Sequence, residues 1–131
     1  MFKQKILNAD MKILLLEDME DIREQMKKDL KEIGHEASVD EAETVQKALE
    51  FCKLNRYDFI ISDWNLPDGN GFDFLQKVKA SSKFKTTPFL MCTTMDDVSN
   101  ILSAVEAGAN DYLVKPWDNE ELSKKIQSCL D

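Results

Sequence analysis

The feature of this sequence that most limits its fold is a regular alternation of short apolar runs with segments of helical periodicity. Five short runs are predicted to be β-strands: residues 11–17, 36–40, 57–62, 87–93 and 111–115. Several are continuously apolar, as strands covered on both faces are, and the second run is the least apolar. Between the runs, apolar residues recur at helical spacing. They are Met19, Ile22, Met26, Leu30 and Ile33, then Val45, Ala48, Leu49 and Cys52, then Phe72, Leu75 and Val78, then Val98, Ile101, Leu102 and Val105, and finally Leu122, Ile126 and Leu130.

This alternation predicts an α/β fold of the (βα)₅ type. We expect a flavodoxin-like, doubly wound, parallel five-stranded sheet in the order 2-1-3-4-5, with right-handed crossovers and helices on both faces. The apolar helical stripes are assigned to the core rather than to a cofactor. A length of 131 residues fits one domain. Residues 1–10 are interpreted as a polar lead-in and residues 11–131 as the domain.

Composition excludes several classes of function. Acidic residues outnumber basic ones by 25 to 17, and the net charge of −8 argues against nucleic-acid binding. The cysteines, Cys52, Cys92 and Cys129, are few and widely spaced, which argues against a disulfide framework or a zinc site. No apolar run is long enough to span a membrane. We expect a cytoplasmic monomer without nucleic-acid or membrane partners. His35 follows Gly34 at a helix end and is interpreted as a loop residue without a chemical role.

Polar residues follow four of the predicted strands. Glu17 and Asp18 end the first, Asp63 the third, Thr93 the fourth and Lys115 the fifth. In open α/β sheets, ligands bind outside the carboxyl ends of the strands, so these side chains should share one edge. Three carboxylates about 5 Å apart repel by roughly 3 kcal/mol per pair at an effective dielectric of about 20. A divalent cation would offset this repulsion, and hard oxygen ligands suit Mg²⁺.

The same residues have the chemistry of phosphoryl transfer. Asp63 can act as a carboxylate nucleophile, Thr93 can donate to a phosphoryl oxygen, and Lys115 can neutralise charge. Simpler interpretations exist for single residues: Asp18 as the N-cap of the first helix, Asp63 as the start of a turn, and Lys115 as a solvated strand end. Their coincidence at one sheet edge favours the shared site.

Three other kinds of site use residues of the same segments. A calcium loop that starts at Asp63 would need glycine in place of Asp68 and glutamate in place of Phe74, so the calcium loop is excluded. Asp68 is then expected to be solvated. An aspartyl-phosphate hydrolase needs a second acid, where Asn65 stands. A flavin phosphate loop would have to form from the acidic residues 17–21, which would repel a phosphate. Among functions of a different class, the aspartyl-phosphate hydrolase is the alternative that stays open.

Four motifs occur in order along residues 11–131: Glu17-Asp18, then Asp63-Trp64-Asn65-x-Pro67 with Gly71, then Thr93, then Tyr112-x-Val114-Lys115-Pro116. In these motifs the chain resembles the receiver domains of two-component response regulators, and chemotaxis members most of all. The resemblance implies that Asp63 is the phosphoacceptor. It also implies that Mg²⁺ is held by Glu17, Asp18, Asp63 and the main-chain carbonyl of Asn65.

The resemblance further implies a switch. Thr93 is expected to follow the phosphoryl group, Lys115 to pair with it, and the Tyr112 ring to change rotamer, although a static half-buried Tyr112 stays open. The Lys115–Pro116 bond is expected to be cis. The chain departs from the family in having Glu17 where Asp is more frequent, Met95 near the path of attacking water, and an unusually acidic helix start at residues 20–21.

The implied function is that of a signalling switch rather than an enzyme, one that promotes its own phosphorylation and slow autodephosphorylation. A sensor histidine kinase would phosphorylate Asp63. The surface of the fourth helix, fifth strand and fifth helix would then change its affinity for a protein target. The surface residues expected to do this are Ile101, Tyr112, Val114 and Lys125. No output domain is expected after the last helix, so chemotaxis or flagellar-motor signalling is favoured, with a phosphorelay intermediate as the alternative.

Overall fold

The computed structural model describes residues 6–94 and 98–131, and it leaves the Val98 side chain out. Within these residues the main sheet contains β1 (Lys12–Leu16), β2 (Ser38–Ala42), β3 (Phe59–Asp63), β6 (Phe89–Thr93) and β7 (Asp111–Val114), all parallel and in the order β2-β1-β3-β6-β7. The helices are α1 (Glu20–Glu32), α2 (Val45–Leu54), α3 (Gly71–Lys79), α4 (Val98–Glu106) and α5 (Asn119–Leu130). The predicted (βα)₅ fold and strand order are confirmed.

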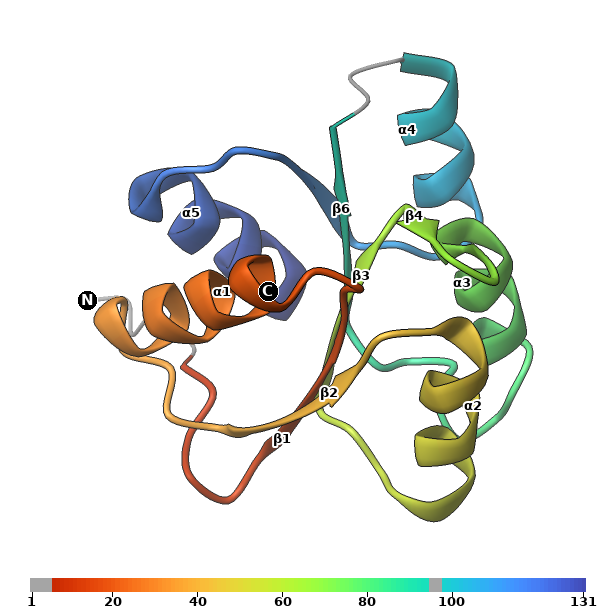
Figure 1. The fold of residues 1–131 in the computed structure, drawn as a ribbon, viewed down its shortest axis with the longest axis horizontal. Helices are drawn as coiled ribbons and strands as arrows, with labels where there is room; N and C mark the ends of the chain where they lie inside the picture. Colours follow the sequence, from red (N-terminus) through yellow and green to blue (C-terminus); the bar gives the residue numbers. More distant parts are fainter. Residues whose placement is uncertain (1–5, 95–97) are drawn as a thin grey trace.

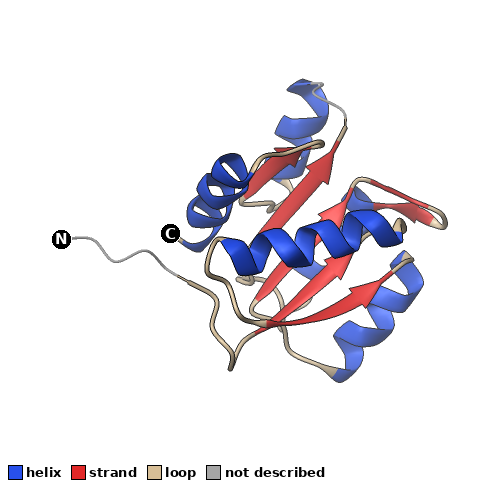
Figure 2. Ribbon diagram, turned by 60° about the vertical axis from the view of Figure 1, so that its left-hand side comes forward, coloured by secondary structure: helices blue, strands red, loops and turns tan. Residues whose placement is uncertain are grey.

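The helices form two layers around the sheet. In Figure 1, α1 and α5 cover one face, and α2, α3 and α4 cover the other. Figure 2 shows the parallel strands between these layers. Successive side chains of β1 point to opposite faces of the sheet. Leu14 and Leu16 pack in the apolar cluster under α2 and α3, and Ile13 and Leu15 pack in the cluster under α1 and α5. This explains why the strands are apolar at consecutive positions.

Several boundaries differ from those predicted. Strand β2 lies two residues later than the predicted 36–40, because its position is set by pairing with β1, in which Lys12 is opposite Ser38. Strand β3 extends to Asp63 itself, which therefore has the fixed backbone of a strand end. A small antiparallel pair, β4 (Asn65–Leu66) and β5 (Gly69–Asn70), was not predicted and shapes the loop before α3.

The prediction that every helical stripe is core was wrong in α4. Leu102 is 55% exposed and Val105 is 46% exposed, whereas Ala104 is buried. The small Ala104 thus belongs to the buried cluster, and the larger Leu102 and Val105 lie at the surface. Met19, predicted as the first core residue of α1, is likewise exposed.

The described part of the lead-in is attached to the domain. Leu7 is buried, and its amide donates a hydrogen bond to Nδ1 of His35 (3.0 Å). His35 does lie in the loop between α1 and β2, but it is buried there, and burial lowers its pKa. It therefore holds the lead-in in place. None of the described helices has the length and apolar character needed to span a lipid bilayer.

Candidate functional site

The polar residues singled out in the sequence meet at the carboxyl edge of the sheet. Glu17 directly follows β1, Asp63 ends β3, Thr93 ends β6 and Lys115 directly follows β7. Glu17, Asp63 and Thr93 are buried, and Asp18 is exposed. Carboxylate oxygens of Glu17, Asp18 and Asp63 lie within 4.8 Å of one another. The predicted gathering of three carboxylates is therefore present.

A single ammonium group joins two of these carboxylates. Nζ of Lys115 lies 2.8 Å from Oε1 of Glu17 and 3.1 Å from Oδ1 of Asp63. This cation thus lies between two buried acids and is not the solvated strand end of the simpler interpretation. The Lys115–Pro116 bond is cis, as expected.

The backbone around Asp63 is closely packed. The amide of Trp64 donates to Oδ1 of Asp63 (2.8 Å), and the amide of Gly71 donates to the carbonyl of Trp64 (2.7 Å). A Cβ atom added to Gly71 would lie 2.2 Å from the main-chain oxygen of Asp63. Only glycine fits at this position without moving the backbone of the aspartate.

Burial and mutual repulsion shift the titration of the site. Burial raises the pKa of Asp63, Lys115 opposes the shift, and the charge of Asp18 adds to it. Burial also raises the pKa of Glu17, with an opposing hydrogen bond from Lys115 and a further increase from the charge of Asp63. For Lys115, burial disfavours the charged form, but the two paired carboxylates outweigh it and raise the pKa.

The site therefore has an excess of negative charge, three carboxylates against one ammonium. Its donors are hard oxygens at the mouth of the sheet, with exposed Asp18 on the solvent side. These donors fit a divalent cation such as Mg²⁺, which takes few protein ligands and keeps several waters. The residues present are thus able to hold a metal ion.

Two interpretations of single acids were wrong. Asp18 is not the N-cap of α1, since Met19 holds that position and makes no side-chain capping bond. Asp68 is exposed but is not merely solvated. Its carboxylate accepts hydrogen bonds from the amides of Val45 (2.8 Å) and Gln46 (3.0 Å) at the start of α2, and these bonds lower its pKa.

The residues of the predicted partner surface belong to α4, β7 and α5. Ile101, Tyr112, Val114 and Lys125 are all half-buried. Nζ of Lys125 lies 4.2 Å from the centre of the Tyr112 ring and 3.3 Å from a carboxylate oxygen of Asp111. The exposed Leu102 and Val105 of α4, which sequence reasoning assigned to the core, add apolar area to α4. Met95 lies outside the described residues.

An apolar groove of about 370 Å³ opens beside Lys115. It is lined by Met19, Ile22, Gln25, Thr94, Lys115, Pro116 and Trp117. Nε1 of Trp117 donates to the buried carboxylate of Asp29 on α1 (2.8 Å), which also accepts from Gln25 (2.8 Å). The segment after Lys115 is thereby tied to α1.

Sequence reasoning missed one polar residue at the site. Arg23 is buried on α1, and its Nη1 donates to the main-chain oxygen of Glu17 (2.9 Å). Its position between Ile22 and Met26 in the apolar stripe of α1 is a signal that could have revealed it, because a cation in such a stripe needs buried partners.

The family profile for the response regulator receiver domain matches residues 13–127, which is most of the chain. The chain belongs to this family. The receiver domain is 34% identical over 128 residues to chemotaxis protein CheY-3 of Vibrio cholerae, with 98% of each chain covered. Among solved structures, it is similar to chemotaxis response regulator CheY4 of Vibrio cholerae, with a TM-score of 0.80 and 35% identity over 89% of this chain and 96% of that one. It is thus a receiver domain of the CheY type.

A further similar structure contains a metal ion. It is the receiver domain of a sensor histidine kinase from Pseudomonas aeruginosa, with a magnesium ion coordinated in its active-site cleft. The two domains align with a TM-score of 0.79 and 26% identity, over 92% of this receiver domain and 97% of the other.

Proposed function

We propose that this receiver domain acts as a response regulator whose Asp63 accepts a phosphoryl group from the phosphohistidine of a sensor histidine kinase. The observation that carries the proposal is the cluster of three carboxylates that includes Asp63, in which Lys115 pairs with both Asp63 and Glu17. In this proposal Mg²⁺ is held by Glu17, Asp18, Asp63 and the main-chain carbonyl of Asn65. A magnesium ion in the cleft of the similar Pseudomonas domain supports this choice of metal.

The contacts of Asp63 indicate which of its oxygens reacts. Both Lys115 and the amide of Trp64 contact Oδ1, so we assign Oδ2 as the nucleophile. The bond between phosphorus and the donor's imidazole nitrogen breaks, a bond from phosphorus to Oδ2 forms, and the imidazole leaves. Bound Mg²⁺ supplies positive charge that offsets the phosphoryl oxygens. Lys115 stays beside Asp63 and neutralises part of the added charge.

The added phosphoryl group then changes a protein-binding surface. Thr93 ends β6, one residue beyond the strand partner of Asp63, and its hydroxyl moves toward the phosphoryl oxygens. Tyr112 lies on the adjacent β7, opposite Met91, and turns into the space that Thr93 leaves. The surface of Ile101, Tyr112, Val114 and Lys125 changes its affinity for a target protein by a coupling of about 1–3 kcal/mol.

The chemotaxis names of relatives that match nearly the full chain favour a chemotaxis-type role over a phosphorelay role. The kinase is the partner that brings the phosphohistidine to the site. We propose that its histidine-bearing helix approaches over the apolar groove beside Lys115, since that groove offers an apolar contact and is lined by the lysine that pairs with Asp63.

The test is incubation with Mg²⁺ and acetyl phosphate, followed by measurement of intact mass. We expect one labile phosphate on the wild-type protein and none on Asp63→Asn. The matched control is Asp73→Asn, which changes an exposed aspartate in the first turn of α3 and should keep the adduct.

Each result distinguishes the candidates. An adduct that persists in Asp63→Asn contradicts the site. Steady release of inorganic phosphate without any adduct favours the hydrolase. Passage of the phosphate from the labelled protein to a histidine phosphotransfer protein, with no effect of phosphorylation on target binding, favours the relay.

A further inference from the structure

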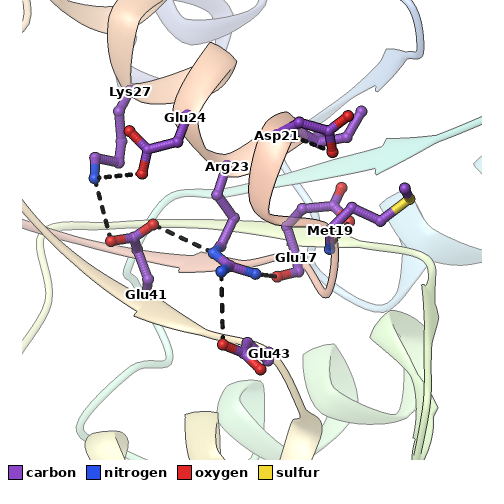
Figure 3. A network of polar contacts seen from close by, with 9 residues as sticks. Glu17, Met19, Asp21, Arg23, Glu24, Lys27, Glu41 and Glu43 are labelled. Carbon is purple, nitrogen blue, oxygen red and sulfur yellow. Dashed lines mark hydrogen bonds and ion pairs between the residues drawn. The ribbon is translucent and has the colours of Figure 1, made fainter.

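Arg23 is the centre of a polar network behind the acidic cluster. Its side chain is only 9% exposed. Besides its 2.9 Å bond to the main-chain oxygen of Glu17, its guanidinium contacts Oε1 of Glu41 (3.3 Å) and Oε1 of Glu43 (3.5 Å). Figure 3 shows the guanidinium pointing from α1 into the space between these three acceptors, which come from the ends of β1 and β2.

The network extends outward through Lys27. Its Nζ bridges Oε2 of Glu41 (3.2 Å) and Oε1 of Glu24 (3.1 Å), and these bonds raise the pKa of Lys27. A buried guanidinium usually contributes less to stability than an apolar side chain of similar size would. Arg23 also lies in a stripe where Met or Leu would pack well. Its donors therefore point to a role beyond filling the core.

The bond to Glu17 identifies that role. The amide of Glu17 donates to the carbonyl of Ala42 on β2 (3.0 Å), and the carbonyl of Glu17 accepts from Arg23 (2.9 Å). The main-chain amide and carbonyl of this acid are thus both held, at the point where the chain leaves β1 and presents Glu17 and Asp18 to the cluster. We infer that Arg23 is a positioning residue for the cation site, acting through the backbone of Glu17.

The charges around Arg23 are arranged to suit this role. A lone guanidinium behind three carboxylates would weaken the binding of a cation by repulsion. Glu41 and Glu43 neutralise it at short range, so Arg23 orients the ligand without opposing the metal ion. Hydrogen bonds behind a metal ligand typically change metal affinity about 10- to 100-fold.

The inference rests on the proposed function, because it assumes that the acids bind Mg²⁺. The test is a titration with Mg²⁺ followed by the fluorescence of Trp64, together with unfolding in urea and EDTA. Arg23→Met keeps a long stem without donors, and we expect it to weaken Mg²⁺ binding about 10-fold or more. Arg23→Lys keeps the charge, and its affinity for Mg²⁺ should lie between those of wild type and Arg23→Met.

The sign of the change separates the roles that Arg23 could have. If its effect were only electrostatic, removing a positive charge would tighten Mg²⁺ binding. If Arg23 served only stability, the unfolding midpoint would fall while the Mg²⁺ dissociation constant stayed the same. The matched control is Lys27→Met, which removes a cation of the same network that does not touch Glu17, and it should leave binding unchanged or slightly tighter.

Unchanged or tighter binding in Arg23→Met overturns the inference. If Arg23→Met fails to fold, the test rests on Arg23→Lys. A Mg²⁺ dissociation constant of Arg23→Lys equal to that of wild type then overturns the inference as well. A wild-type protein that does not bind Mg²⁺ at all overturns the proposed cation site, and this inference with it. Wild-type binding that is weakened only in the Arg23 variants supports both.

Discussion

Replacing the central aspartate, Asp63→Asn, should stabilise the metal-free protein. The substitution keeps the size of the side chain and removes the negative charge of a residue that is only 7% exposed. Lys115 does not lose all its partners, because Glu17 stays 2.8 Å from its Nζ. Burial and the neighbouring acid raise the pKa of Asp63, so the folded state holds this charge at a net cost.

The distances set the size of the effect. With carboxylate oxygens within 4.8 Å, the repulsion of Asp63 by buried Glu17 is about 3.5 kcal/mol at an effective dielectric of about 20. Exposed Asp18 adds about 1 kcal/mol, because water screens it. Attraction between Lys115 and the Asp63 carboxylate, 3.1 Å apart, stabilises the charged form by about 5 kcal/mol. These contributions nearly cancel and leave the desolvation of the charge uncompensated, so we expect a gain of roughly 1–2 kcal/mol in unfolding free energy.

The assay is urea unfolding in EDTA at pH 7, followed by tryptophan fluorescence. An acid whose folded-state pKa is raised costs stability as pH rises above its ordinary pKa. The advantage of Asp63→Asn should therefore shrink as pH falls from about 7 toward 4. Excess Mg²⁺ should reverse the order, since wild type gains about 2.7 kcal/mol at 100 times the dissociation constant and the variant loses most of this gain.

The control is Asp10→Asn, which makes the same chemical change at an exposed site of the lead-in and should alter stability by less than about 0.5 kcal/mol. A variant less stable than wild type in EDTA would refute this account, because it would mean that Lys115 more than compensates the charge of Asp63. An advantage that does not depend on pH would also contradict it, since the effect would then not be one of charge.

Three further predictions concern the surroundings of the site. Gly71→Ala should displace the backbone of Asp63, because no room exists for a Cβ atom; we expect a loss of about 1–3 kcal/mol in urea and slower labelling by acetyl phosphate. His35→Gln should be less sensitive to acid than wild type, because a buried His with a lowered pKa costs stability as pH falls below about 6.5; unfolding midpoints between pH 5 and 7.5 check this. Trp117→Phe should cost about 1–3 kcal/mol by removing a donor from buried Asp29, as measured by urea unfolding followed by circular dichroism.

The sequence was sufficient for the fold class and for the composition of the site. Strand and helix periods depend on neighbours in the chain, so the (βα)₅ pattern is visible without any tertiary contact. Parallel strands carry their carboxyl ends to one edge, and this brings Glu17, Asp63, Thr93 and Lys115 to the same edge. The order of the motifs was sufficient to identify the family.

Only the tertiary structure decided which groups contact one another. Lys115 pairs with both Glu17 and Asp63, and Arg23 holds the carbonyl of Glu17, across separations in sequence that no local pattern encodes. The same holds for the outward face of α4, where exposed Leu102 continues a stripe that looks like core. A periodic stripe shows which residues share a side of a helix. How much of that side is covered depends on how closely the helix approaches the sheet, and this is set by packing between distant segments.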